Sequence, residues 1–282
     1  MKKLILLFGF LLLAGCSTKF TYNNLDWLIH WYVDDYVELS DRQENLFDEH
    51  FANWLNWHRS EELAKYVKHL KSLKADVENE RLTAESISDH LWKSREHWER
   101  LRDHVSPELA QLAAQLTDEQ VESLFKELSE ENDEIAEKLA EAEGKSEDEV
   151  TESRVEDIED GISDYVGRLS KQQKAIIRQY APDFHGTRAL WLAYRKDFQL
   201  AARKLINKRE NNPEFETEFV ALLTHPDEFR STDYQQLRLQ NTQLYGRMLE
   251  QLFYILSDKQ KNKLINKIDD MIEDFEYLMS ND

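Results

Sequence analysis

The sequence predicts an all-α protein built as a bundle of helices. Glycine and proline are scarce, at 7 and 4 in 282 residues, and few stretches alternate apolar with polar residues as a half-buried strand does. Leu, Glu, Lys, Gln and Ala dominate instead, and these side chains lose little freedom on entering a helix. With 7 Trp, 11 Tyr and 13 Phe to bury, we expect a folded body and not a disordered chain.

Caps and apolar periodicity place the helices along the chain. Ser106-Pro107 is predicted to restart the chain, with serine as N-cap and proline at the first helical position. Gly144 is expected to end the longest acidic helix, and Pro182 to end a short one at the preceding residue. The predicted helices are 24–37, one opening at 40, 61–77, one opening at 83, one restarting at 106, 117–144, 146–169, 170–181, 187–209, a short one between 213 and 225, 231–256, and a last one from 257 with an apolar seam at 264, 268, 271, 275 and 278.

One short motif, Leu-Ser/Thr-x-x-Gln, occurs four times. It has the form of a capping box, in which the hydroxyl accepts the backbone N–H three residues on and the glutamine reaches back to the N–H of the cap. Each box is expected to stabilise its helix by about 1 kcal/mol. The cap and glutamine pairs are Ser40 with Gln43, Thr117 with Gln120, Ser170 with Gln173, and Ser257 with Gln260.

The order of these motifs predicts an internal duplication. Five short landmarks, the capping motifs among them, recur in the same order at offsets of 129 to 141 residues. We therefore expect two related helical halves, 24–167 with a long acidic hairpin and 168–282 packed on the first. Capping preference alone is the alternative explanation. The duplication requires the helices that start at Ser40 and Ser170 to occupy equivalent places.

The N-terminus has the pattern of a secretory signal peptide, residues 1–15. Lys2 and Lys3 precede an apolar run that is too short to span a bilayer. The next residues, Leu13-Ala14-Gly15-Cys16, resemble the lipobox of bacterial lipoproteins. The resemblance implies that Cys16 receives a diacylglycerol and a further fatty acid such as palmitate, and that residues 16–23 are a lipidated tether. Ser17, in place of the aspartate that retains lipoproteins in the inner membrane, favours the periplasmic face of the outer membrane of a Gram-negative bacterium. A buried cysteine beside an uncleaved anchor is the alternative.

Two family resemblances follow from these motifs. Leu-Ser/Thr-x-x-Gln is similar to the hallmark of periplasmic stress chaperones of the Spy and CpxP type, which implies a cradle for unfolded client proteins. This chain departs from that pattern because it is about twice as long, lipid-anchored and acidic. The lipobox followed by Tyr22-Asn23-Asn24-Leu25-Asp26-Trp27-Leu28 resembles uncharacterised proteobacterial lipoproteins, known only as a domain of unknown function.

The charge of the chain excludes one class of partner. The formal net charge is −20 at pH 7, and 20 acidic against 4 basic residues lie between positions 118 and 164. Such a surface repels nucleic acid, because binding requires Lys and Arg to displace counterions. We expect the acidic hairpin to be a solvated face with a mobile tip at 142–151, and stable membrane attachment to come from the acyl chains.

Searches for catalytic and metal-binding motifs return nothing specific. His90, His97 and His104 share a sevenfold spacing, which separates neighbours by about 10 Å along a helix and is too far for one ion. No His-Glu-x-x-His and no Gly-x-Ser-x-Gly is present, and no free thiol remains once Cys16 is acylated. We therefore expect no metal, no cofactor and no catalytic residue.

Two aromatic clusters are the candidate walls of a cleft, if the protein has one. They are Trp54, Trp57 and His58 in the first half, and Trp191, Tyr194 and Arg195 in the second. Core packing is the simpler interpretation of both.

The resulting hypothesis is a non-enzymatic outer-membrane lipoprotein that binds another envelope protein or unfolded clients. The alternative is a cell-wall enzyme or small-ligand-binding lipoprotein that uses the aromatic cleft. A third possibility is a partner that docks on the acidic hairpin, with binding that depends strongly on salt.

Overall fold

The computed structural model describes residues 17–280 and confirms the all-α prediction, because this part of the chain forms helices and turns without a strand. The predicted signal peptide, residues 1–15, and the predicted acylation residue Cys16 lie outside the described residues. None of the helices within 17–280 has the length and apolar character needed to cross a bilayer.

The described chain divides into two units, each assembled from three stretches of sequence. Unit 1 holds residues 17–62, 96–137 and 188–231, and unit 2 holds residues 63–95, 138–187 and 232–280. Helices α6 (Ala84–Ala114) and α7 (Asp118–Glu143) contribute to both units. The division into two sequence halves, 24–167 and 168–282 packed on the first, stays a prediction.

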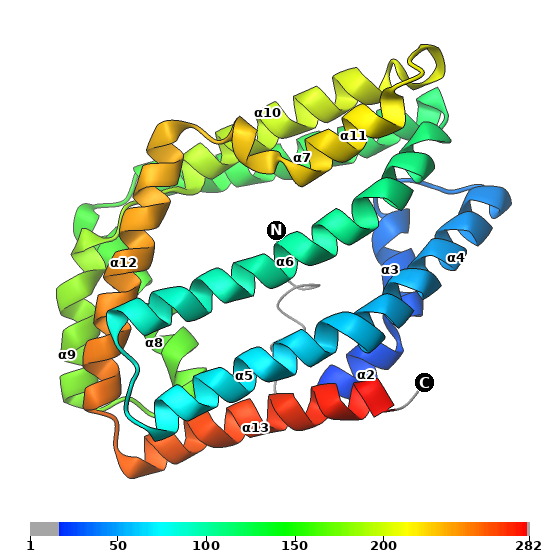
Figure 1. Ribbon diagram of the computed structural model, residues 1–282. Helices are drawn as coiled ribbons and strands as arrows, with labels where there is room; N and C mark the ends of the chain where they lie inside the picture. Colours follow the sequence, from blue (N-terminus) through cyan, green and yellow to red (C-terminus); the bar gives the residue numbers. More distant parts are fainter. Residues whose placement is uncertain (1–16, 281–282) are drawn as a thin grey trace. The chain divides into compact units, whose positions relative to one another are not determined.

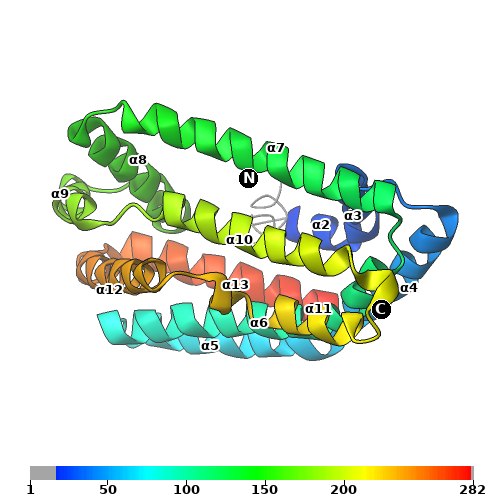
Figure 2. The ribbon, with the colours of Figure 1, turned by 90° about the horizontal axis from the view of Figure 1, so that it is seen from above.

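Unit 1 is organised around antiparallel helices that share an apolar core. Helices α7 and α10 run in opposite directions (Figures 1 and 2). Their side chains meet at two places, where Asn132 donates to Gln199 at 2.6 Å and where Arg203 pairs with Glu122. The elements of this unit are α2 (Ser17–Asn23), α3 (Leu25–Asp34), α4 (Asp41–Trp57), the π-helical turn η2 (His58–Glu62), parts of α6 and α7, α10 (Arg188–Ile206), η4 (Arg209–Asn211), α11 (Phe215–Thr224) and η5 (Pro226–Phe229).

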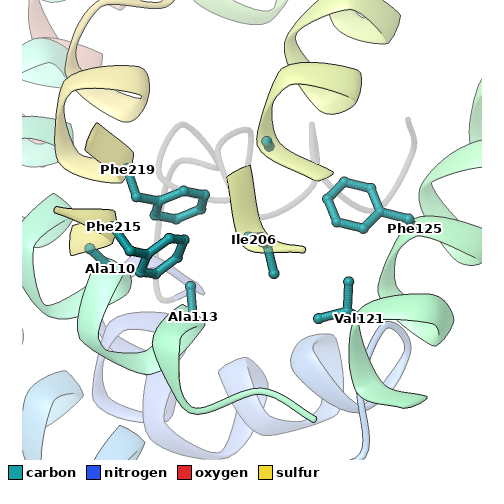
Figure 3. Close-up of a cluster of buried hydrophobic side chains, with 8 residues drawn as sticks. Ala110, Ala113, Val121, Phe125, Ile206, Phe215 and Phe219 are labelled. Carbon is teal, nitrogen blue, oxygen red and sulfur yellow. The ribbon is translucent and has the colours of Figure 1, made fainter. Parts of the chain in front are cut away.

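The core of unit 1 is filled by side chains from α6, α7, α10 and α11. Phe215 and Phe219 of α11 stack at 5.4 Å and face Ile206 of α10 (Figure 3). Two alanines of α6 allow the neighbouring helices to approach, which is why small residues sit beside large ones here. The cluster comprises Ala110, Ala113, Val121, Phe125, Ala202, Ile206, Phe215 and Phe219.

Unit 2 pairs α5 with α13 along their full lengths (Figure 1). Ile268, Phe275 and Leu278 of the predicted seam are buried, and Lys74 of α5 forms an ion pair with Asp269 of α13 at 2.6 Å. Gly246 lets α12 approach the first turn of α6 closely, because a Cβ at this position would lie 3.0 Å from the Ala84 carbonyl oxygen. The elements are α5 (Leu63–Glu78), parts of α6 and α7, α8 (Glu147–Val166), α9 (Lys171–Tyr180), η3 (Ala181–Asp183), α12 (Thr232–Tyr254) and α13 (Asp258–Ser280).

Two local expectations differ from the structure. The chain does not restart at Ser106-Pro107, because α6 continues through Pro107 while the Ser106 hydroxyl donates to the Arg102 carbonyl at 2.6 Å. Residues 17–23, predicted as a short polar tether, form helix α2, and burial of Tyr22 holds this helix in unit 1. The helix predicted over 61–77 is α5, which the π-helical turn joins to α4 without a break.

Candidate functional site

The four capping glutamines meet in pairs that the sequence did not predict. In unit 1 the side-chain amides of Gln43 and Gln120 form a cyclic pair, each donating to the other's oxygen at 2.8–2.9 Å. The second amide proton of Gln43 is donated to the Gln115 carbonyl at 2.8 Å, and that of Gln120 to the Glu38 carbonyl at 2.7 Å. Each glutamine therefore binds the backbone five residues before its partner.

Unit 2 repeats this arrangement with the other two glutamines. Gln173 and Gln260 donate to each other at 3.0 Å, and their second protons go to the carbonyls of Ile255 and Arg168 at 3.3 and 3.1 Å. These carbonyls again lie five residues before the partner glutamine. The same four hydrogen bonds occur in both units, which supports the duplication because unrelated capping boxes have no reason to share a long-range partner.

All four glutamines also perform the capping that their sequence indicates. Each Oε1 accepts the backbone N–H of its cap residue, over 2.8 to 3.1 Å. The amide oxygen and both amide protons are thus used, which matters because Gln173 is 1% exposed and an unsatisfied buried amide is costly. A pocket of about 540 Å³ opens beside the unit 1 pair, lined by Glu38, Arg42 and the two motifs.

The first aromatic cluster is largely core. Trp54 is 9% exposed and packs edge-on against Phe47. Trp57 stacks on His104 with ring centroids 3.7 Å apart, so both residues are engaged. His58 is buried, and its Nδ1 shares a hydrogen bond of 2.8 Å with the Tyr22 hydroxyl.

The second aromatic cluster belongs to a polar network of unit 1. The Arg195 guanidinium pairs with Glu131 and lies 5.7 Å from the Trp191 ring centroid. The same carboxylate accepts a hydrogen bond of 2.5 Å from the Tyr36 hydroxyl. Burial, together with this bond to Glu131, raises the pKa of Tyr36. Tyr194 is covered by Arg230 at 5.1 Å. Neither cluster lines the pocket beside Gln43 and Gln120 or the one between α2, α3 and α4, and a cleft walled by these six residues stays a prediction.

A different pocket of about 520 Å³ lies between α2, α3 and α4 in unit 1. Its walls include Tyr22, Trp27 and Phe51, and its polar side chains include Asp48, which hydrogen-bonds His30 at 2.6 Å. Asp48 is 54% exposed and is not the buried, converging carboxylate that an enzyme would need. The pocket therefore gives no support to the enzyme alternative.

A buried charged group lies at the π-helical turn between α4 and α5. Glu62 is fully buried, and both of its oxygens accept from Arg100 Nε at 3.1 Å. Burial lowers the pKa of His58, one turn earlier, to about 4, although the Glu62 carboxylate acts in the opposite direction. Burial also raises the pKa of Tyr22 to about 12. Nothing in the local sequence distinguishes this turn from an ordinary helix.

The three evenly spaced histidines have separate partners. His90 Nε2 lies 3.1 Å from Asp76 Oδ2 and its Nδ1 lies 3.1 Å from His69 Nε2, all within unit 2. His97 contacts Arg100, and His104 contacts Trp57. Across residues 17–280 no group of three or more His, Cys, Asp or Glu side chains is arranged to hold a metal ion.

These observations define an all-helical protein with two equivalent glutamine-linked helix pairs. A family model, the Family of unknown function (DUF6279), matches residues 35–235. This match covers more than half of the chain, which therefore belongs to that family. No curated protein and no solved structure matches the chain.

Replacing Gln173 with alanine is expected to lower the free energy of unfolding by about 2 kcal/mol, because the amides and carbonyls it serves lose buried hydrogen bonds. Q43A should have a similar effect, since the two pairs are equivalent. Urea denaturation followed by circular dichroism measures both. Q172A is the matched control, because Gln172 is the exposed neighbour. Equal stability of Q173A and Q172A would contradict the assigned role.

The buried His58 predicts acid sensitivity. Its pKa is about 4 in the fold and near 6.5 in the unfolded chain, so the unfolded chain takes up the proton first as the pH falls. The free energy of unfolding should therefore decrease by about 3 kcal/mol between about pH 6.5 and about pH 4. H58Q keeps a hydrogen-bond partner for Tyr22 and should flatten this dependence, whereas H185Q at an exposed site should not. An unchanged pH dependence in H58Q contradicts the prediction.

Proposed function

We propose that this chain is a lipoprotein acylated at Cys16, held on the periplasmic face of the outer membrane, whose helical body binds another envelope protein without catalysis. The observation that carries the anchor is the sequence Leu13-Ala14-Gly15-Cys16 at the end of a short apolar run, with the only cysteine of the chain at its end. The next residue after Cys16, Ser17, is already the first residue of helix α2, which belongs to unit 1.

The binding role is supported by the acidic hairpin. Residues 141–150 are all exposed, and six of these ten positions carry charged side chains, five of them acidic. A capping box starts α8 in this turn, with the Ser146 N–H donating to Glu149 Oε2 at 2.8 Å. An exposed anionic turn offers a docking point to a basic partner and uses no catalytic group.

A chaperone-like role is the second candidate, and the repeated Leu-Ser/Thr-x-x-Gln motif favours it. The two roles differ in what they recognise. A folded basic partner would bind through charge at the hairpin, whereas unfolded clients would bind through apolar surface and would be less affected by salt.

The anchor predicts that Cys16→Ser will move the protein from the membrane fraction to the soluble periplasmic fraction. A serine hydroxyl cannot form the thioether that holds the diacylglycerol, so labelling with radioactive palmitate should also be lost. Fractionation of the parent and the variant, expressed at equal levels, measures the change. Membrane association of the variant equal to that of the parent would overturn the proposed anchor.

The hairpin predicts that neutralising its exposed charges will reduce capture of the partner. E141Q/E147Q/D148N removes three charges and leaves the Ser146–Glu149 capping box intact. E210Q/E214Q/E216Q is a control with the same charge change at exposed positions of unit 1. Crosslinking in intact cells should trap a basic partner several-fold less with the hairpin variant, and not with the control.

Equal loss in both variants would reduce the effect to net charge, and no loss in either would remove the hairpin as the docking point. Capture that is unaffected by both variants and by salt, together with suppressed aggregation of a denatured test protein, would favour the chaperone-like role.

A further inference from the structure

Three aromatic side chains near the start of the described chain are more than half exposed. Phe20 of α2 is 69% exposed, and Trp27 and Trp31 of α3 are 67% and 57% exposed. Trp27 and Trp31 are one turn apart and therefore share a face of α3. Single exposed aromatic side chains are ordinary on protein surfaces. Three of them within 12 residues add much more exposed apolar surface to one short segment of the chain.

The helices that carry these side chains are attached firmly to unit 1. Tyr22 of α2 is 3% exposed, its hydroxyl bonds to His58, and the Arg59 guanidinium lies 5.3 Å from its ring centroid. His30 of α3 is bound to Asp48 of α4 at 2.6 Å. The aromatic side chains consequently keep their place relative to the rest of the unit.

Phe20, Trp27 and Trp31 follow the proposed acylation residue Cys16 closely in the sequence. From Ser17 to Tyr22 the helical rise is roughly 7.5 Å, so the buried Tyr22 lies about one and a half turns from the start of α2. If acyl chains on Cys16 enter a bilayer, α2 and α3 are held at its surface. Phe20 follows Cys16 by four residues and Trp27 follows it by eleven, roughly 6 and 16 Å of helical rise, so both side chains can reach the lipid headgroups.

The residue types suit that location. Tryptophan combines a large apolar ring with one N–H donor and is enriched at the boundary between headgroups and acyl chains. Attraction between basic side chains and anionic lipids is not the driving force, because the chain is strongly acidic and Asp26, Asp34 and Asp35 are exposed nearby. The contact must then depend on aromatic burial.

We propose that Phe20, Trp27 and Trp31 form a face that inserts into the headgroup region of the bilayer to which the protein is anchored. This inference rests on the proposed lipidation of Cys16 and adds a second, non-covalent membrane contact. Together the anchor and the face would fix the orientation of unit 1 at the membrane, instead of leaving it free to rotate about a tether.

The test uses the mature chain from Cys16 onward, coupled through its only thiol to a maleimide-bearing phospholipid in phosphatidylcholine vesicles. This coupling supplies the anchor chemically, so the result does not depend on acylation in cells. Part of the phosphatidylcholine carries bromine on its acyl chains and quenches the fluorescence of any tryptophan that touches them. The intact protein should be quenched by the brominated vesicles.

The variant W27F/W31F removes the two reporting rings and keeps aromatic bulk, so it should lose most of this quenching. W92F is the matched control, because Trp92 of α6 is also 57% exposed, and it should retain the quenching of the parent protein. Quenching that is absent from the coupled parent protein, or equal in W27F/W31F and the parent, overturns the membrane-facing assignment.

A failure of the proposed lipidation can be told apart from a failure of the aromatic face. Protein isolated from cells without an acyl group on Cys16, detected by intact mass, removes the lipoprotein assignment. Quenching of the chemically coupled protein still reports on the aromatic face by itself.

Discussion

The fold depends on a hydrogen-bonded pair of glutamine amides that occurs once in each unit. Each amide caps the start of its own helix, bonds to its partner, and binds the chain that leads into the partner helix. A glutamate would lack the two donated protons, and an asparagine is one methylene too short to keep both ends of this arrangement. The motif Leu-Ser/Thr-x-x-Gln is therefore more than a helix start, because its glutamine joins two segments that lie 77 residues apart in unit 1 and 87 in unit 2.

The sequence predicted the local half of this arrangement and not the long-range half. Capping chemistry is contained in four consecutive residues, so Ser40 with Gln43 and Ser170 with Gln173 could be read directly. The partner of each amide is set by how the helices pack, and a capping box contains no information on that packing. The π-helical turn at His58–Glu62 and the uninterrupted α6 at Pro107 were missed for a related reason, since tertiary contacts compensate for local backbone preference at both places.

The candidate site shows the same limit. Periodicity identified Trp54 and Trp191 as aromatic positions at helical spacing, but it could not say whether the space beside them is filled. In the structure Trp54 is buried, and Arg195, beside Trp191, pairs with Glu131. Periodicity also could not show that Trp27 is exposed, or that only one short helix, α2 from Ser17, lies between it and the predicted acylation residue Cys16.

The central claim is that each unit contains one glutamine pair that links two of its own helices, and that the two pairs are equivalent. Hydrogen exchange of side-chain amides, observed by NMR on protein labelled with ¹⁵N at glutamine, tests it most directly. The account predicts slow exchange for the side-chain amides of Gln43, Gln120, Gln173 and Gln260, and rapid exchange for exposed Gln172. Rapid exchange at all four, or protection confined to one pair, would contradict it.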